Sequence, residues 1–115
     1  MMKKKRTLRV GMIGYNFMGM AHSNAWRQAP RFFDLGAEVE LHTICGRTKV
    51  GVEKAADRLG WRQASTDWRK VVEDPEIDVI DICTPNDSHC EIALAAAKAG
   101  KAILCEKPLA LNVEQ

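Results

Sequence analysis

The stretch Gly14 to Gly19 reads G-Y-N-F-M-G and lies between an apolar run and a helical pattern. It has the frame of the phosphate-binding turn G-x-G-x-x-G, with Asn16 in the place of the middle glycine. In such a turn the first glycine permits the bend, the last lets the helix pack closely on the strand, and a pyrophosphate binds at the helix N-terminus. Asn16 tolerates a left-handed backbone better than most residues, but its side chain would crowd the phosphates. The stretch predicts a dinucleotide site; a tight turn without a ligand is the alternative.

A second group of polar residues follows the next apolar run, where Cys45 to Thr48 reads C-G-R-T. An acidic residue at this place would bind the 2′-hydroxyl of the adenosine ribose, and none is present. Gly46 leaves room, while Arg47 and Thr48 offer a positive charge and a hydroxyl, which suit a 2′-phosphate. The residues therefore favour NADP over NAD. The alternative is that Arg47 stacks on the adenine or faces water.

Two further strand ends carry unusual residues. Cys83 to His89 reads C-T-P-N-D-S-H, and we expect Asn86 and His89 to point into a cleft beside the glycine turn. His89 as an ordinary residue in the first turn of a helix is the alternative. Ala102 to Cys105 reads as a buried strand and runs directly into Glu106, Lys107 and Pro108. Taken alone, Lys107 is most simply a surface lysine.

Strand and helix patterns alternate along the whole chain. Apolar runs predict strands at Leu8–Ile13, Val39–Cys45, Ile77–Cys83 and Lys101–Cys105, with a short one inside Trp61–Ser65. Helices are predicted at Phe17–Ala29 and at Lys49–Leu59. Thr66 or Asp67 is expected to cap a brief helix through Val72, and Asp87 or Ser88 to cap a long helix to Ala99. Pro30 is expected to stop the first helix, and Gly60 and Gly100 to close the second and the last.

This order predicts right-handed crossovers and a parallel sheet. We therefore expect an α/β fold: a Rossmann-like, doubly wound, mainly parallel sheet in a three-layer αβα arrangement. The first helix is expected to place Met18, Ala21, Ala25 and Ala29 on one face. Asp81 interrupts an apolar strand and needs a hydrogen-bonding partner or access to solvent.

Composition limits the function classes. The 115 residues are 46% apolar and 28% charged, with a formal net charge of +2, as in a soluble globular domain. We expect residues 1–7 to form a basic flexible tail and residues 8–115 to form one domain. The near-balanced charge predicts no nucleic-acid partner, and no run is long enough to cross a membrane, so a cytoplasmic protein is expected. The cysteines and histidines lack metal-ligand spacing, so no metal is predicted.

Three stretches resemble the N-terminal domain of the Gfo/Idh/MocA oxidoreductases, the glucose–fructose oxidoreductase and inositol dehydrogenase family. They are V-G-M-I-G-Y-N-F-M-G-M-A-H at Val10 to His22, D-V-I-D-I-C-T-P-N-D-S-H at Asp78 to His89, and A-G-K-A-I-L-C-E-K-P-L-A at Ala99 to Ala110. The resemblance implies NAD(P)-dependent hydride transfer on a sugar, polyol or related secondary alcohol. The strand followed by E-K-P is the most specific of the matching features.

The resemblance also implies a role for individual residues. Lys107 would be the catalytic residue, contacting the substrate hydroxyl and assisting proton transfer, with a cis bond to Pro108 aiming it into the cleft. Glu106 would orient Lys107 or the cofactor. The implied cofactor-binding residues come from four segments. They are Gly14, Tyr15 and Asn16 in the turn, the backbone N–H groups of Phe17 and Met18 toward the pyrophosphate, Gly46 and Arg47 toward the adenosine, Thr84, Pro85 and Asn86 along the nicotinamide ribose, His89, and Glu106 and Lys107 after the last strand.

Family members continue into a second domain, which supplies the substrate pocket and the oligomer interface. This chain ends before that domain, so we expect it to be inactive by itself and to lack the interface. A stand-alone, non-catalytic NAD(P)-binding or sensing module is the alternative function. A degenerate domain that binds nothing is a further alternative. The intact E-K-P favours the dehydrogenase, because a sensor has no use for that lysine.

Overall fold

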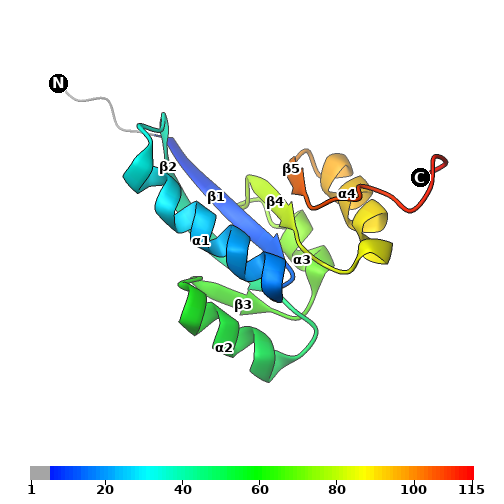
Figure 1. The fold of residues 1–115 in the computed structure, drawn as a ribbon, viewed down its shortest axis with the longest axis horizontal. Coiled ribbons are helices and arrows are strands. Elements are labelled where there is room, and N and C mark those ends of the chain that lie inside the picture. The colour runs from blue at the N-terminus through cyan, green and yellow to red at the C-terminus, as the bar shows by residue number, and fades with distance from the viewer. Residues whose placement is uncertain (1–5) are drawn as a thin grey trace.

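The computed structural model describes residues 6–115, which form a parallel sheet between two layers of helices (Figure 1). Its strands are β1 (Arg6–Ile13), β2 (Ala37–Cys45), β3 (Gln63–Ser65), β4 (Val79–Ile82) and β5 (Ala102–Cys105). They pair in the order β3-β2-β1-β4-β5, and each neighbouring pair is parallel. The chain leaves β1 toward β2 and later returns to the other side of β1 with β4. The carboxyl ends of β1 and β4 therefore form the topological switch point, where such sheets bind ligands.

The helices are α1 (Phe17–Phe32), α2 (Lys49–Leu59), α3 (Trp68–Glu73) and α4 (His89–Lys98). One apolar core lies between the sheet and α2, and includes Val10, Met12, Ile44 and Val52. A second core lies on the opposite face against α3 and α4, and includes Ile80, Ile82, Val72 and Ile92. Both faces of the central strands are covered, which explains their nearly continuous apolar sequences. The predicted fold class is confirmed.

Helix α1 differs from its prediction in length and in its buried face. It continues past Pro30, which lies in the last turn, to Phe32. Near a helix end the ring costs only one backbone hydrogen bond, so Pro30 does not stop the helix. The buried residues of α1 are Gly19 and Ser23 rather than the predicted Met18, Ala21, Ala25 and Ala29. Small side chains on the inner face let α1 lie close to the sheet, and three of the predicted residues, Met18, Ala21 and Ala25, are exposed.

The other helix boundaries follow local capping. Thr48 accepts a hydrogen bond from the Gly51 N–H at the start of α2, and Gly60 closes that helix with a left-handed backbone. Asp67 caps α3 by accepting from two backbone N–H groups. A short 3-10 turn, η1 (Asn86–Ser88), precedes α4, which begins at His89 with Ser88 at its N-cap, one of the two caps that the sequence predicts.

The N-terminal boundary also differs from the sequence prediction. Arg6 and Thr7 were assigned to the flexible tail, but they belong to β1 and pair with Ala37 and Glu38 of β2. The remainder of that predicted tail lies outside the described residues. None of the helices between residues 6 and 115 is both long enough and apolar enough to span a lipid bilayer.

Candidate functional site

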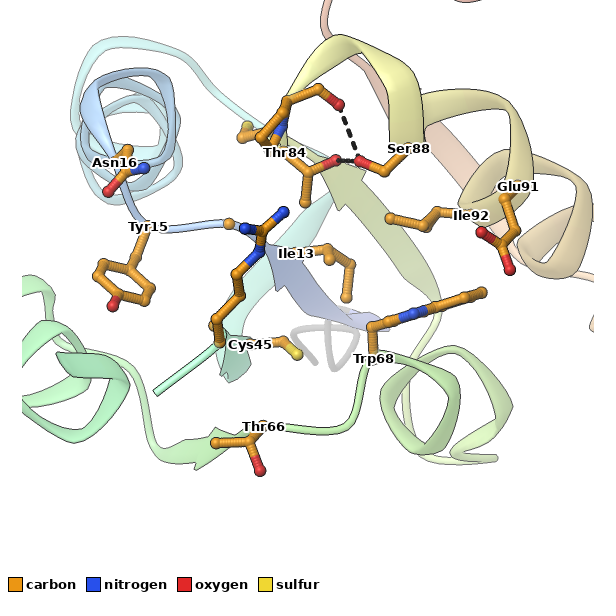
Figure 2. A pocket seen from close by; sticks show the side chains of 15 residues that line it. Ile13, Tyr15, Asn16, Cys45, Thr66, Trp68, Thr84, Ser88, Glu91 and Ile92 are labelled. Carbon is orange, nitrogen blue, oxygen red and sulfur yellow. Dashed lines mark hydrogen bonds between the residues drawn. The ribbon is translucent and has the colours of Figure 1, made fainter. Parts of the chain in front are cut away.

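A cleft of about 320 Å³ opens at the carboxyl ends of β1, β2 and β4 (Figure 2). Seven of the residues predicted to bind the cofactor line it: Gly14, Tyr15, Asn16, Gly46, Arg47, Thr84 and Pro85. They come from three segments that are far apart in the sequence and are brought together by the order of the strands. The cleft thus lies at the switch point of the sheet, as the sequence predicts.

The glycine turn has the geometry that close packing requires. Gly14 has a φ of +105°, and a Cβ atom there would lie 2.7 Å from the carbonyl oxygen of Cys83. A Cβ atom on Gly19 would overlap the carbonyl oxygen of Gly14, so the turn and the helix touch through backbone alone. Asn16 has a φ of −74°, in the ordinary extended region. Asn16 therefore does not need the left-handed backbone that asparagine tolerates.

The N-terminus of α1 faces this turn with free donors. The first helical hydrogen bond runs from the Met20 N–H to the Asn16 carbonyl, at 2.9 Å. The N–H groups of Phe17 and Met18 therefore have no acceptor within the helix. Asn16 makes no side-chain capping bond, and the first turn carries no acidic residue. Free N–H groups, the positive end of the helix dipole and the close backbone approach at Gly14 and Gly19 fit a pyrophosphate.

Tyr15 closes the end of the cleft next to β2. Its ring packs over Gly46, where any Cβ atom would overlap the ring, and its hydroxyl lies 3.4 Å from Oγ1 of Thr48. The Thr48 hydroxyl also caps α2, so the capping bond fixes it in place. Arg47 is exposed beside these groups. The adenosine end of a dinucleotide would thus meet one free guanidinium and no carboxylate from the end of β2.

Sequence reasoning missed two residues at the wall between β3 and α3, Thr66 and Trp68, which also line the cleft (Figure 2). Trp68 is partly buried, and the Arg69 guanidinium lies 4.4 Å from the centre of its ring. Arg69 is held in turn by Glu91 at 2.9 Å. The wall is therefore an aromatic surface braced from α4. Its sequence signal was weak, because Trp68 matched the apolar pattern of a core residue.

Thr84 and Pro85 form the opposite wall, after β4. The Ser88 hydroxyl lies 2.6 Å from Oγ1 of Thr84 and 2.8 Å from the Pro85 carbonyl oxygen, which fixes the turn (Figure 2). Asn86 is exposed, and it is not among the described residues that line the cleft. The same holds for Phe17 and Met18, which offer backbone donors at the rim.

His89 does not point into the cleft. Its side chain is 1% exposed, and its Nδ1 and Nε2 atoms each lie 2.7 Å from a carbonyl oxygen, of Pro108 and Thr84 respectively. The ring thus joins the wall after β4 to the turn after β5. The expectation that His89 lines the cleft is corrected, because the residue begins α4 with its ring directed into the protein.

The Glu106–Pro108 turn follows β5, and its Lys107–Pro108 peptide bond is cis, as the resemblance implied. The Glu106 N–H donates to the Ile82 carbonyl at 3.0 Å, which extends the pairing of β5 with β4 by one residue. The Lys107 side chain is exposed. Neither Glu106 nor Lys107 lines the cleft among the described residues.

A buried ion-pair network under the turn was not predicted. His22 on α1 has Nδ1 2.8 Å from Oδ1 of Asp81 and Nε2 2.7 Å from Oε1 of Glu106. Trp26 Nε1 donates to Asp81 at 2.8 Å, so the fully buried carboxylate of Asp81 has the partners it needs. Burial lowers the pKa of His22, but hydrogen bonds to Asp81 and Glu106 and their negative charges outweigh burial, so the pKa is raised above its usual value. The sequence indicated this network only through Asp81, the carboxylate that interrupts an apolar strand.

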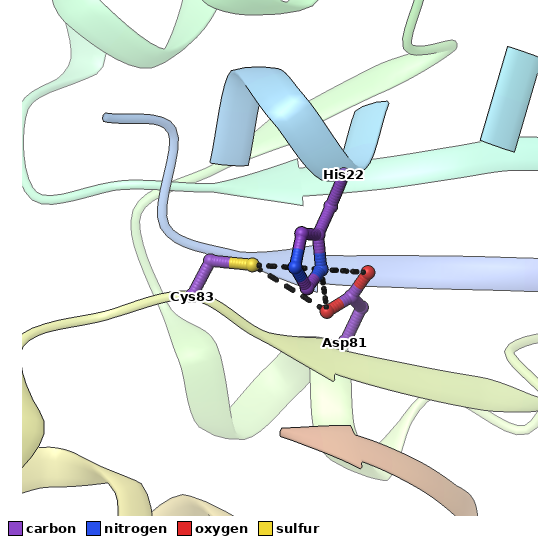
Figure 3. Close-up of side chains that lie close together, drawn as sticks. All are labelled: His22, Asp81 and Cys83. Atoms are coloured by element: carbon purple, nitrogen blue, oxygen red, sulfur yellow. Dashed lines mark hydrogen bonds and ion pairs between the residues drawn. The ribbon is translucent and has the colours of Figure 1, made fainter. Parts of the chain in front are cut away.

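Cys83 adds a thiol to this network (Figure 3). Its Sγ lies 3.3 Å from Nδ1 of His22 and 3.4 Å from Oδ1 of Asp81. Burial and the charge of Asp81 raise the pKa of the Cys83 thiol, so it stays protonated and can donate. The three groups lie close enough together to surround one metal ion. Hydrogen bonds among them account for the cluster without a metal.

The sheet order, the glycine turn, and the helix N-terminus beside the switch point define a dinucleotide-binding Rossmann domain. Within that class the chain belongs to the Gfo/Idh/MocA oxidoreductase family, described as an oxidoreductase family with an NAD-binding Rossmann fold, which matches residues 8–115.

Curated relatives are sugar and polyol dehydrogenases. The chain is 44% identical to levoglucosan dehydrogenase of Pseudarthrobacter phenanthrenivorans over 96% of its length and 28% of that protein. It is 33% identical to inositol 2-dehydrogenase/D-chiro-inositol 3-dehydrogenase of Lactiplantibacillus plantarum over 99% of its length and 31% of that protein. The chain therefore spans less than a third of the curated relatives it matches.

Solved structures agree with the fold. An oxidoreductase domain protein from Kribbella flavida shares 55% identity with a TM-score of 0.88, over 91% of this chain and 28% of that one. A levoglucosan dehydrogenase in complex with NADH shares 47% identity with a TM-score of 0.89, over the same shares of the two chains. The same enzyme has also been solved with NADH and levoglucosan together.

Proposed function

We propose that this chain is the coenzyme-binding part of an NAD(P)-dependent dehydrogenase that acts on a secondary alcohol of a sugar or polyol. One observation carries the proposal: the cleft at the switch point lies at the same sheet edge as the Glu106–Pro108 turn, because β4 and β5 end side by side. A nucleotide-binding module without catalysis has no need for a lysine there. The named substrates of the relatives, levoglucosan and inositol, support an alcohol carbon on a ring as the hydride donor.

The bound nicotinamide would exchange hydride with the alcohol carbon, and the residues of this chain would bind, orient and protonate. The turn at Gly14 and the first N–H groups of α1 hold the pyrophosphate. Thr84 and Pro85, fixed by Ser88, form the wall along the nicotinamide ribose. Lys107 takes up or returns the proton of the substrate hydroxyl at its Nζ.

We assign the choice between NADPH and NADH to Arg47. With no carboxylate after β2 to bind a 2′-hydroxyl, and with an exposed guanidinium in that place, we infer that NADPH binds more tightly than NADH. Tyr15 and Thr48 leave Arg47 as the free donor, because their hydroxyls are engaged with each other and with α2. Because a levoglucosan dehydrogenase has been solved in complex with NADH, the test must measure the binding of both NADH and NADPH.

The test is a titration of this chain with NADH and with NADPH, followed by nicotinamide fluorescence. Saturable binding of either supports the proposal, and absence of binding of both would overturn it. Arg47→Ala should weaken NADPH by about 1–3 kcal/mol, the scale of a lost hydrogen bond to a charged group, and spare NADH. Arg31→Ala, an exposed arginine in the last turn of α1, is the matched control. Equal losses for both coenzymes would remove Arg47 from the choice.

A further inference from the structure

The turn that carries Lys107 is tethered on both sides by a histidine. The Glu106 carboxylate lies 2.7 Å from Nε2 of His22, and the Pro108 carbonyl lies 2.7 Å from Nδ1 of His89. His22 belongs to α1 and His89 begins α4, on opposite faces of the sheet. The exposed Lys107 thus sits between two fixed neighbours, and its place depends on these contacts as well as on β5.

The contact through His22 needs a charged ring. Asp81 and Glu106 carboxylates only accept hydrogen bonds, so each ring nitrogen of His22 must carry a proton to bond to both. Asp81 is fully buried on β4 and is also held by Trp26. Glu106 is therefore bonded to a cation that is itself fixed to the centre of the sheet. Charge-assisted hydrogen bonds of this kind are about twice as strong as neutral ones.

We propose that His22 is a positioning residue, whose doubly protonated ring is shared between Asp81 and Glu106 and fixes the Glu106–Pro108 turn against the sheet. The inference rests on the proposed function in one respect, that Lys107 in this turn moves the substrate proton. His22 lines no part of the cleft among the described residues and acts only through Glu106. A neutral ring has one N–H group and can donate to only one of the two carboxylates. The turn is therefore held at pH values where His22 is charged and is loosened above them.

The thiols near His22 stay uncharged in the neutral range. The Cys83 thiol, after β4, donates to the Asp81 carboxylate at 3.4 Å, and the Cys105 thiol, at the end of β5, donates to the backbone carbonyl of Glu106 at 3.3 Å. Burial and the negative charge of Asp81 raise the pKa of both thiols. On α1 itself, Trp26 donates to Asp81 and does not titrate. Loss of the proton on His22 is then the charge change that releases Glu106 as pH rises.

Amide hydrogen exchange of the 115-residue chain, measured by NMR, tests this directly. The Glu106 N–H donates to the Ile82 carbonyl at 3.0 Å, at the end of β5 next to the turn, and the Ala102 N–H donates to the Asp78 carbonyl at 3.1 Å, at the far end of the same strand. His22→Gln should speed exchange at Glu106 by about tenfold or more, the effect of a lost charge-assisted hydrogen bond, and leave Ala102 unchanged. In the unmodified chain, protection at Glu106 should fall as pH rises through the pKa of His22, and in His22→Gln it should not.

Two controls make the outcome decisive. His42→Gln removes another buried histidine with a carboxylate partner, Glu76 at 3.2 Å, and should leave exchange at Glu106 unchanged. Equal exchange at Glu106 in His22→Gln and the unmodified chain would overturn the proposal, and so would equal acceleration at Glu106 and Ala102. Where His22→Gln does not fold, Glu106→Gln serves instead: it should lower the pKa of His22, read from the ring nitrogen shifts, and an unchanged pKa would overturn the proposal. None of these readouts needs a coenzyme, so a failure to bind NADH or NADPH would count against the proposed function alone.

Discussion

At the scale of single residues, Lys107 is the side chain on which the proposed reaction depends. It is exposed, it forms the cis peptide bond with Pro108, and it is not among the described residues that line the coenzyme cleft. Lys107→Ala should therefore change the affinity for NADH or NADPH by no more than a few fold. In a full-length form with the proposed dehydrogenase activity, the same change should abolish hydride transfer, measured from nicotinamide absorbance.

Lys98→Ala is the matched control, because it removes an exposed lysine in the last turn of α4. It should change neither coenzyme affinity nor turnover. Turnover that survives Lys107→Ala would exclude this lysine from the proton transfer.

Gly14 carries a backbone requirement that no other residue type meets. Its φ of +105° is costly for a side chain, and a Cβ atom would lie 2.7 Å from the Cys83 carbonyl oxygen. Gly14→Ala should lower the free energy of unfolding by about 1–3 kcal/mol or more, measured by urea unfolding, because strain and overlap add. Gly36→Ala is the control, since a Cβ atom there meets no atom within 4 Å. Equal stability of the two variants would show that the turn relaxes around the new methyl group.

At the scale of elements, one hydrogen-bonded chain joins α1 to the segment between α2 and β3. The buried Ser23 hydroxyl donates to the Gly19 carbonyl at 2.7 Å and accepts from Trp61 Nε1 at 2.9 Å. Ser23→Ala would leave a buried indole N–H without a partner, which costs about 1–3 kcal/mol. Denaturant unfolding should show that loss, whereas Asn24→Ala, exposed on the same helix, should be close to neutral. A neutral Ser23→Ala would mean that Trp61 finds another acceptor.

The elements themselves could be predicted well from local patterns, and the inner face of α1 could not. The predicted bounds of α2 are confirmed, because the apolar spacing and Gly60 that predict them act within a few residues of each other. The apolar pattern failed for α1, since its inner face carries small and polar groups that satisfy Asp81, far away in the sequence. For the cleft, strand ends identified the residues of three turns, but Trp68 and the inward turn of His89 depend on how α3 and α4 pack.

At the scale of the whole molecule, two ion pairs with opposite responses to pH hold the central strands. The first joins β1 to the residue before β4, where Arg9 donates to Asp78 through its backbone at 2.9 Å and its side chain at 3.3 Å. Burial raises the pKa of Asp78, but these bonds and the charge of Arg9 outweigh burial and leave it below the usual 3.8. The pair therefore adds stability above pH 3.8 that is lost as pH falls through the lowered pKa. Because both side chains are partly exposed, the loss should stay below about 1 kcal/mol.

The second pair, at His22, limits stability on the alkaline side. Its pKa in the folded chain is raised above 6.5, so its contribution is complete below that pH and is lost as pH rises through the raised value. A buried thiol acts at higher pH: the unfolded thiol of Cys45 ionises near 9.0, whereas burial raises its pKa in the folded chain to about 11, so stability is lost between these two values. The free energy of unfolding should accordingly decline as pH rises above 6.5 through the raised pKa of His22, measured by urea unfolding at each pH. His22→Gln should remove this decline and Asp78→Asn should leave it intact. A decline of equal slope in His22→Gln would mean that another group titrates there.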